Sequence, residues 1–275
     1  MQTKPTLVIE AGRTERRYWL DLWEYRELLY FLAWRDILVR YKQTVIGVLW
    51  ALIRPLVTIV IFSVVFGGIA NLPSDGVPYP LLVCAAMLPW QFFSNAFSEI
   101  GNSLVGNANL VSKTYFPRLV IPASILVVAS VDFAISFAIL IALMVWYGVV
   151  PGWQVAVLPV FVLVAAAAAF GSGLWIAALN VKYRDFRYLI PFIVQVGLFI
   201  SPVGFSSNVV PDKWRLLYSL NPMVGVIDGF RWSLLGGNGE LYWPGIALSM
   251  LFVGGLLATG LAFFRRTERT FADVI

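Results

Sequence analysis

The segment NVKYRDFRYLIPFIVQVGLFISPVGF, residues 180–205, changes within a few positions from a basic turn to an apolar run. The apolar part, 189–204, holds only about 16 residues, whereas a helix needs about 20 to cross a membrane comfortably. Two short amphipathic pieces follow, each opened by a proline, Pro211 and Pro222. A short span that leads into a broken, half-buried hairpin indicates a membrane protein with a pathway rather than a simple anchor.

The composition places the whole chain in or against a bilayer. Of its 275 residues, 60% are hydrophobic and 13% are charged. A soluble domain is typically about 45–50% apolar and about 25% charged. We therefore predict a polytopic membrane protein without a soluble domain.

Two residue counts exclude several kinds of chemistry. The chain has no histidine, which removes the commonest general base and metal ligand, and its single cysteine, Cys84, cannot form an internal disulfide. We predict no metal site and no catalytic residues. The chain also lacks a phosphate-binding loop, G-x-x-x-x-G-K-[ST]. Lys113 is the only lysine followed by Ser or Thr, and the two positions where the loop needs glycine hold Asn107 and Ser112. If ATP is used, another chain must hydrolyse it.

The apolar segments predict an all-α integral membrane protein with six transmembrane helices. The expected spans are 47–69, 80–103, 120–147, 155–179, 189–204 and 245–264. Residues 18–42 are too charged to cross, and their tryptophans, tyrosines and arginines favour an amphipathic interfacial helix. The alternative is a helix docked on a soluble partner or on the chain's own bundle. The small residues at 165–173, AAAAAFGSG, favour close helix packing.

The basic residues predict the orientation. Lysine and arginine gather in the N-terminal segment, in the loops 103–118 and 181–187, and in the tail, whereas 71–79 and 148–154 hold none. The positive-inside rule then puts both termini in the cytoplasm. The net charge of +5 thus reflects topology and not nucleic-acid binding. The expected organisation is a cytoplasmic N-terminus (1–46), a six-span domain (47–264) and a cytoplasmic tail (265–275).

Three ionisable residues lie inside expected spans, where an unpaired charge is costly and often functional. Arg54 and Glu99 should lie at similar depth, so they are either an ion pair or part of a functional site. Asp132 has Ser136 one turn away as a hydrogen-bonding neighbour. A single aspartate is a weak basis for proton coupling.

Two helix faces are candidates for a transport pathway. On the fifth span the face consists of Tyr188, Phe192, Gln195 and Phe199, at positions i, i+4, i+7 and i+11. On the first span the similar face consists of Trp50, Arg54, Thr58 and Phe62. Rings stack on sugars and amides hydrogen-bond to them, so these faces suit a glycan. The alternative is a packing face with Gln195 bonded to a neighbouring helix.

The segment 211–236 reads as two helices that are too short to cross. Asn221 followed by Pro222 predicts an N-cap and a first helical residue. Asp228 and Arg231, three positions apart, can pair on that helix. Irregular backbone at membrane depth is tolerated only inside protein or beside water. We expect re-entrant helices that form an outer gate.

Four motifs in a fixed order resemble a known family. They are WRDILVRYKQTVIGVLWALIRPL (34–56), NLVSKTYFPRLVIP (109–122), YRDFRYLIPFIVQVGLFISPV (183–203) and NPMVGVIDGFRWSLLG (221–236). The chain is similar to the membrane subunit of type-2 ABC exporters, in the branch that exports O-antigen, capsular polysaccharide or teichoic acid. The resemblance covers most of the chain.

The resemblance implies a homodimer in the bacterial cytoplasmic (inner) membrane, bound to two copies of a separate ATPase that holds ATP and Mg. It implies a coupling helix at about 107–117 and a channel between spans 1 and 5 of both protomers. Expected ATPase contacts are Ser112, Lys113, Tyr115 and Phe116. The implied substrate is a glycan on polyprenyl pyrophosphate. The charges of the interfacial helix add a hypothesis for that pyrophosphate, with Arg26, Arg35, Arg40 and Lys42 as its binding residues.

Three alternatives to a polysaccharide exporter stay open. A type-2 exporter of small lipids or drugs shares the fold, although the aromatic content of 15% favours a glycan. A membrane enzyme acting on polyprenol-linked sugars needs paired carboxylates, and the chain has no D-x-D sequence. A purely structural subunit does not explain Arg54, Glu99 and Asp132.

Overall fold

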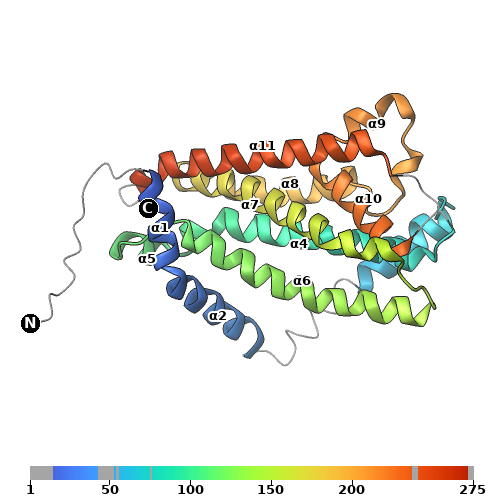
Figure 1. Cartoon of the computed structure of the whole chain (residues 1–275), viewed down its shortest axis with the longest axis horizontal. Coiled ribbons are helices and arrows are strands. Elements are labelled where there is room, and N and C mark those ends of the chain that lie inside the picture. Colours follow the sequence, from blue (N-terminus) through green and yellow to red (C-terminus); the bar gives the residue numbers. More distant parts are fainter. Residues whose placement is uncertain (1–14, 43–52, 54–55, 75, 237–240, 272–275) are drawn as a thin grey trace, which may run out of the picture.

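The computed structural model describes residues 15–42, 53, 56–74, 76–236 and 241–271, with side chains from Tyr18 onward. These residues form helices and no strand, as the sequence predicts. Long helices lie side by side along the molecule, with α1 and α5 at one end and α9 at the other (Figure 1).

Within the described part of the chain, four helices are long and apolar enough to cross a membrane. They are α4 (Tyr79–Gly106), α6 (Val120–Trp146), α7 (Leu158–Lys182) and α11 (Trp243–Thr267). Two shorter apolar helices, Leu56–Ile69 and α8 (Phe186–Ile200), occupy the places of expected spans 1 and 5. The protein is therefore an integral membrane protein of the all-α class, and the total of six crossings stays a prediction.

The remaining elements are short and lie at the two ends of the bundle or along its side. The helices are α1 (Glu15–Glu24), α2 (Arg26–Lys42), α5 (Ala108–Lys113), α9 (Asp212–Tyr218) and α10 (Pro222–Leu235). The tighter or wider turns are η1 (Ser63–Ile69), η2 (Trp153–Val157), η3 (Ser207–Val209) and η4 (Glu268–Thr270). The expected interfacial segment 18–42 thus contains two consecutive helices, of which α2 packs against α6.

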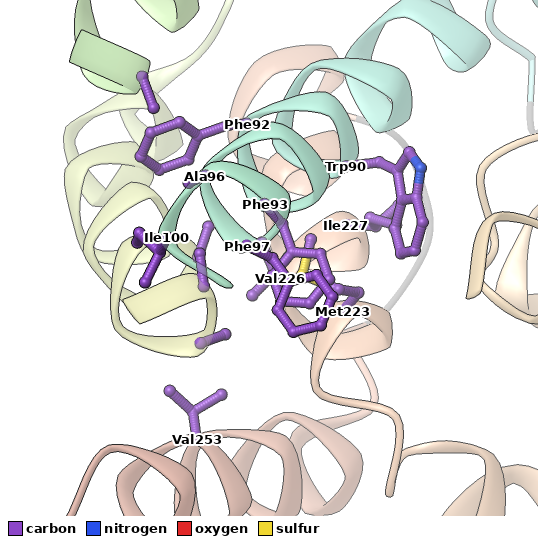
Figure 2. Close-up of a cluster of buried hydrophobic side chains, with 14 of the residues drawn as sticks. Trp90, Phe92, Phe93, Ala96, Phe97, Ile100, Met223, Val226, Ile227 and Val253 are labelled. Atoms are coloured by element: carbon purple, nitrogen blue, oxygen red, sulfur yellow. The ribbon is translucent and has the colours of Figure 1, made fainter. Parts of the chain in front are cut away.

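Helix α4 is the centre of the bundle. Every residue from Leu81 to Trp90 is buried, and the helix packs against α6, α7, α8 and α10. Figure 2 shows its aromatic side chains meeting residues of α10 and α11 in one cluster. The labelled members of the cluster are Trp90, Phe92, Phe93, Ala96, Phe97, Ile100, Met223, Val226, Ile227 and Val253. Because lipid is as apolar as these side chains, close packing rather than exclusion of water stabilises such a contact.

Small residues bring α7 very close to α11. A Cβ atom added to Gly171 would lie 2.7 Å from the Leu257 Cα, and one added to Gly260 would collide with the carbonyl oxygen of Gly171. On the other side of α7, a Cβ atom added to Gly173 would lie 2.7 Å from Ile100 of α4. The prediction of close packing from the small residues at 165–173 is therefore confirmed.

The basic segments of the sequence converge at one end of the bundle. One apolar cluster there joins residues of α2, α5, the ends of α7 and α11, and the tail. It includes Leu32, Val111, Phe116, Val181, Phe264 and Phe271. Helix α9, which carries Lys213 and Arg215, lies at the opposite end (Figure 1). The segments that were expected to share one side of the membrane are thus together in space.

Candidate functional site

Helix α8 presents its aromatic and amide residues away from the bundle. Tyr188, Phe192 and Phe199 are 70%, 62% and 65% exposed, and Gln195 between them is exposed as well. The opposite face of α8 holds the contacts with α4: Ile190 is buried, and a Cβ atom added to Gly197 would lie 2.6 Å from the Trp90 ring. The four residues, which we call the α8 stripe, therefore do not pack against their own chain.

The helix Leu56–Ile69 differs from the expectation for a channel wall. Trp50 and Arg54 lie outside the described residues. Thr58 and Phe62 are half-buried, and Phe62 packs against the core and against the Phe66 ring, with 5.3 Å between ring centroids. The exposed side chains are aliphatic: Leu56, Val57, Val60, Ile61, Val64, Val65 and Ile69.

A glycine explains why Phe62 turns inward. A Cβ atom added to Gly204, just beyond α8, would lie 2.6 Å from Phe66 and 3.3 Å from Phe62. The two rings fill the space that the missing side chain leaves. Phe62 is therefore partly covered by its own chain, and its place on a channel wall stays a prediction.

The loop that contains α5 presents a small polar and aromatic surface. Ser112, Lys113 and Tyr115 are exposed. Their role as ATPase contacts stays a prediction, but they are accessible for it. The Ser112 hydroxyl donates to the Ala108 carbonyl oxygen over 2.9 Å and so helps to hold the short helix.

Phe116 was the fourth residue expected to contact the ATPase, and its burial contradicts that expectation. Its side chain is only 3% exposed and belongs to the apolar cluster at this end of the bundle. The Arg118 guanidinium covers its ring at 5.0 Å from the centroid and donates to the Thr114 carbonyl oxygen over 2.6 Å. Phe116 therefore anchors the loop from inside, because an aromatic ring beside the apolar ends of α5 and α11 is better buried than exposed.

The second helix of the expected gate, α10, begins as predicted. The Asn221 side chain accepts a hydrogen bond from the Met223 amide over 3.0 Å, and Pro222 is the first helical residue. The Asn221 amide nitrogen also donates to the Ser201 hydroxyl over 2.9 Å. The N-cap prediction is thus confirmed, and the cap ties α10 to the end of α8.

Arg231 of α10 binds the loop that follows α8. Its guanidinium donates to the carbonyl oxygens of Leu82, Phe205 and Val203 over 3.1, 2.8 and 3.1 Å. Tyr79 adds a hydrogen bond to the Gly204 carbonyl oxygen over 2.6 Å. Arg231, with Asp228, lines a small pocket at this end of the molecule. The re-entrant gate itself stays a prediction, and these contacts explain how the segment is fastened.

An ionic cluster joins three helices at the side of the bundle. The Arg40 guanidinium of α2 donates to Glu99 of α4 over 2.6 Å and also to Asp132 of α6, which in addition accepts from the Tyr41 hydroxyl. Burial alone would lower the pKa of Arg40, but the attraction of the two carboxylates raises it above its usual value. Burial and the bond to Asp132 raise the pKa of Tyr41. Arg40 is therefore a fixed cation that connects the N-terminal helices to the spans.

This cluster changes two expectations. Glu99 was expected beside Arg54, which lies outside the described residues, and it has Arg40 as a partner. Arg40 was expected to bind pyrophosphate, yet its charge is already balanced by Asp132 and Glu99. The other proposed cations are exposed: Arg26 lies over the Trp23 ring, Arg35 pairs with Asp36 at 2.7 Å, and Lys42 ends α2.

A further polar contact at the tail could not be predicted from the sequence. Glu268 accepts hydrogen bonds from the Tyr18 hydroxyl of α1 over 2.9 Å and from the Arg118 amide over 2.7 Å. A glutamate within the charged run RRTER reads as a solvated residue, so only the fold reveals its partners. The contact ties α1, the start of α6 and the tail together.

Long apolar helices, basic segments gathered at one end, and carboxylates of two of those helices paired with Arg40 of α2 define a multi-pass membrane protein. Residues 27–235 match the family described as ABC-2 type transporter, and since they form most of the chain, the protein belongs to that family. Membership makes it a membrane component of a transport system.

Curated relatives extend along nearly the whole chain. It is 28% identical over 255 residues to the O-antigen export system permease protein RfbA of Klebsiella pneumoniae, covering 90% of this chain and 95% of the relative. The Myxococcus xanthus protein of the same name is 28% identical over 261 residues, covering 93% and 98%. The polysialic acid transport protein KpsM of Escherichia coli is 24% identical over 243 residues, covering 85% and 91%.

Proposed function

We propose that this chain is the membrane-spanning permease of an ATP-driven exporter. Its substrate is a polysaccharide of the O-antigen kind, linked to polyprenyl pyrophosphate, and it moves across the cytoplasmic membrane. The α8 stripe is the observation that carries this proposal: three aromatic rings and one amide face away from the protomer. The names of the relatives, two O-antigen export permeases and a polysialic acid transport protein, support a glycan rather than a small lipid or drug.

The α8 stripe needs a second copy of the chain to become the wall of a channel. A short helix at the edge of a bundle, with aromatic rings exposed, offers one half of a symmetric surface. Two protomers that face each other through α8 and the helix Leu56–Ile69 enclose a path lined by the rings and amides of the α8 stripe and by the aliphatic side chains of Leu56–Ile69. Sugars stack on such rings and hydrogen-bond to such amides, so a moving polymer keeps favourable contacts without a single tight site.

The energy source is a separate ATPase, which membership of the ABC-2 family implies. The α5 loop supplies the contact, through Ser112, Lys113 and Tyr115, which are exposed at the basic end of the bundle. Arg118 and Phe116 hold this loop against the ends of the spans, so a push on α5 is passed to α4 and α6. The ATPase binds ATP and Mg.

The proposed topology has six crossings with both termini in the cytoplasm. The basic end of the bundle faces the cytoplasm, following the positive-inside rule. Helices α9 and α10 then lie on the outer side as gate helices, with Asn221 and Arg231 fastening them to the end of α8. On the inner side Arg26, Arg35 and Lys42 remain the cations for the pyrophosphate of the carrier.

A deletion strain tests the proposal directly. Surface polysaccharide should be lost and the lipid-linked glycan should accumulate inside, and a plasmid-borne copy should restore both. Normal surface polymer in the deletion strain would exclude the polysaccharide, and a change in small-lipid or drug efflux alone would favour the alternative exporter.

A further inference from the structure

A basic cleft lies where α11 ends beside α1. It has a volume of about 490 Å³ and is lined by Trp19 of α1, by Ala258, Leu261 and Ala262 of α11, and by Arg265, Arg266 and Arg269. None of these residues belongs to the α8 stripe, the α5 loop or the gate. The cleft combines three guanidinium groups with an apolar floor, and its function is not explained by the proposed channel.

The cleft is basic because the acidic residue among its arginines points elsewhere. Glu268 turns toward α1 and α6, where its two carboxylate oxygens accept hydrogen bonds from the Tyr18 hydroxyl and the Arg118 amide. Glu268 is not among the residues that line the cleft. Arg265 still lies close enough to Glu268 to interact with its charge, whereas Arg266 and Arg269 are exposed in the cleft.

Aromatic rings position one of the three arginines. The Arg265 guanidinium lies 4.6 Å from the centroid of the Tyr18 ring and 5.8 Å from that of Trp19. Since Tyr18 also holds Glu268, the same ring orients the glutamate away from the cleft and Arg265 beside it. Arg266 and Arg269 are exposed at the rim, where they can reach an anion.

An apolar strip leads from the cleft along α11 toward the middle of the bilayer. Four exposed residues follow one another about once a turn on this helix: Leu251, Gly255, Ala258 and Ala262. Phe252, Gly254 and Thr259 beside them are exposed as well. Trp175 of α7 borders the strip, stacked on Phe263 with 4.1 Å between centroids and donating to the Thr259 hydroxyl over 3.2 Å. Exposed small residues beside a large ring leave room for an acyl chain to lie along the helix.

We propose that this cleft binds the headgroup of an anionic phospholipid, with its phosphodiester between Arg266 and Arg269 and its acyl chain along α11. Basic pockets at the cytoplasmic ends of transmembrane helices are suited to such headgroups. The position at a helix C-terminus by itself favours arginine through the helix dipole. The dipole explains neither Arg269, which lies beyond α11, nor the tryptophan and the cleft.

Native mass spectrometry of the purified full chain tests the site. Phosphatidylglycerol is titrated against phosphatidylcholine for wild type, for R266Q/R269Q, and for the control R184Q/R187Q, which removes two exposed arginines outside the cleft. We expect wild type to retain phosphatidylglycerol preferentially. Each arginine near a headgroup contributes about 1 kcal/mol, so R266Q/R269Q should bind about 30-fold more weakly. The control should retain the wild-type preference.

Several outcomes would overturn the proposal. These are equal retention of the two lipids by wild type, an unchanged preference in R266Q/R269Q, or an equal loss in the control. Glycerol phosphate added in water distinguishes a headgroup site from a site for free phosphates. If it displaces phosphatidylglycerol at similar concentration, the acyl groove contributes nothing and the lipid assignment is wrong. Arg266 and Arg269 are exposed, so their substitution should not disturb folding. An unchanged thermal unfolding temperature verifies that the variants fold.

Discussion

Arg40 of α2 lies 2.6 Å from the Glu99 carboxylate of α4, so a charged N-terminal helix is bonded to one that is long and apolar enough to cross a membrane. The same guanidinium reaches Asp132 of α6. Charges inside a span are costly when unpaired. One cation therefore serves two intramembrane carboxylates and fixes the position of α2.

Removing this cation should loosen α2 from the bundle. In R40Q, Glu99 and Asp132 lose their charged partner, and since the cluster is partly exposed we expect a loss of about 1–3 kcal/mol in the free energy of unfolding. Thermal unfolding in detergent and protease cleavage near α2 measure the effect. R35Q is the control, because Arg35 pairs with Asp36 at an exposed position and should matter by less than about 1 kcal/mol. Equal behaviour of the two variants would contradict the role of the cluster.

Replacing the polar and aromatic part of the α8 stripe should impair export without loss of protein. In Q195L/F199L the amide and one ring are gone while the apolar character of the surface remains, and we expect export to fall about tenfold, equivalent to about 1.4 kcal/mol. Surface polymer and permease abundance are measured in the same cells. V196L, at another exposed position of α8, is the control and should export normally. Parallel losses of export and abundance would support a packing face.

Reversing the charge of Lys113 should uncouple the transporter. K113E changes the exposed surface of the α5 loop, so ATP hydrolysis by the complex should continue with little export, and membrane insertion should stay normal. K182E reverses an exposed charge at the end of α7 and is the matched control. Unchanged export in K113E would remove Lys113 from the contact with the ATPase.

Local signals in the sequence predicted local structure well. The N-cap at Asn221 and the small residues at 165–173 are present as expected, because each depends on neighbours in the chain or on one helix face. The pairing of Arg40 with Asp132 joins residues 92 positions apart. Hydropathy gives the depth of a residue in the membrane but not the direction in which it faces. For the same reason the burial of Phe116 and the hydrogen bonds of Glu268 became visible only in the fold.

The contact between α7 and α11 should be sensitive to a single methyl group. In G171A the new Cβ atom would lie 2.7 Å from the backbone of Leu257, so the helices must move apart, at a cost of about 1–3 kcal/mol in the free energy of unfolding. G254A is the control, since a Cβ atom there meets nothing within 4 Å and alanine favours a helix over glycine by about 0.5–1 kcal/mol. Thermal unfolding should therefore shift down for G171A and remain level or rise for G254A. A G171A protein as stable as wild type would show that α7 and α11 are not in close backbone contact in the membrane.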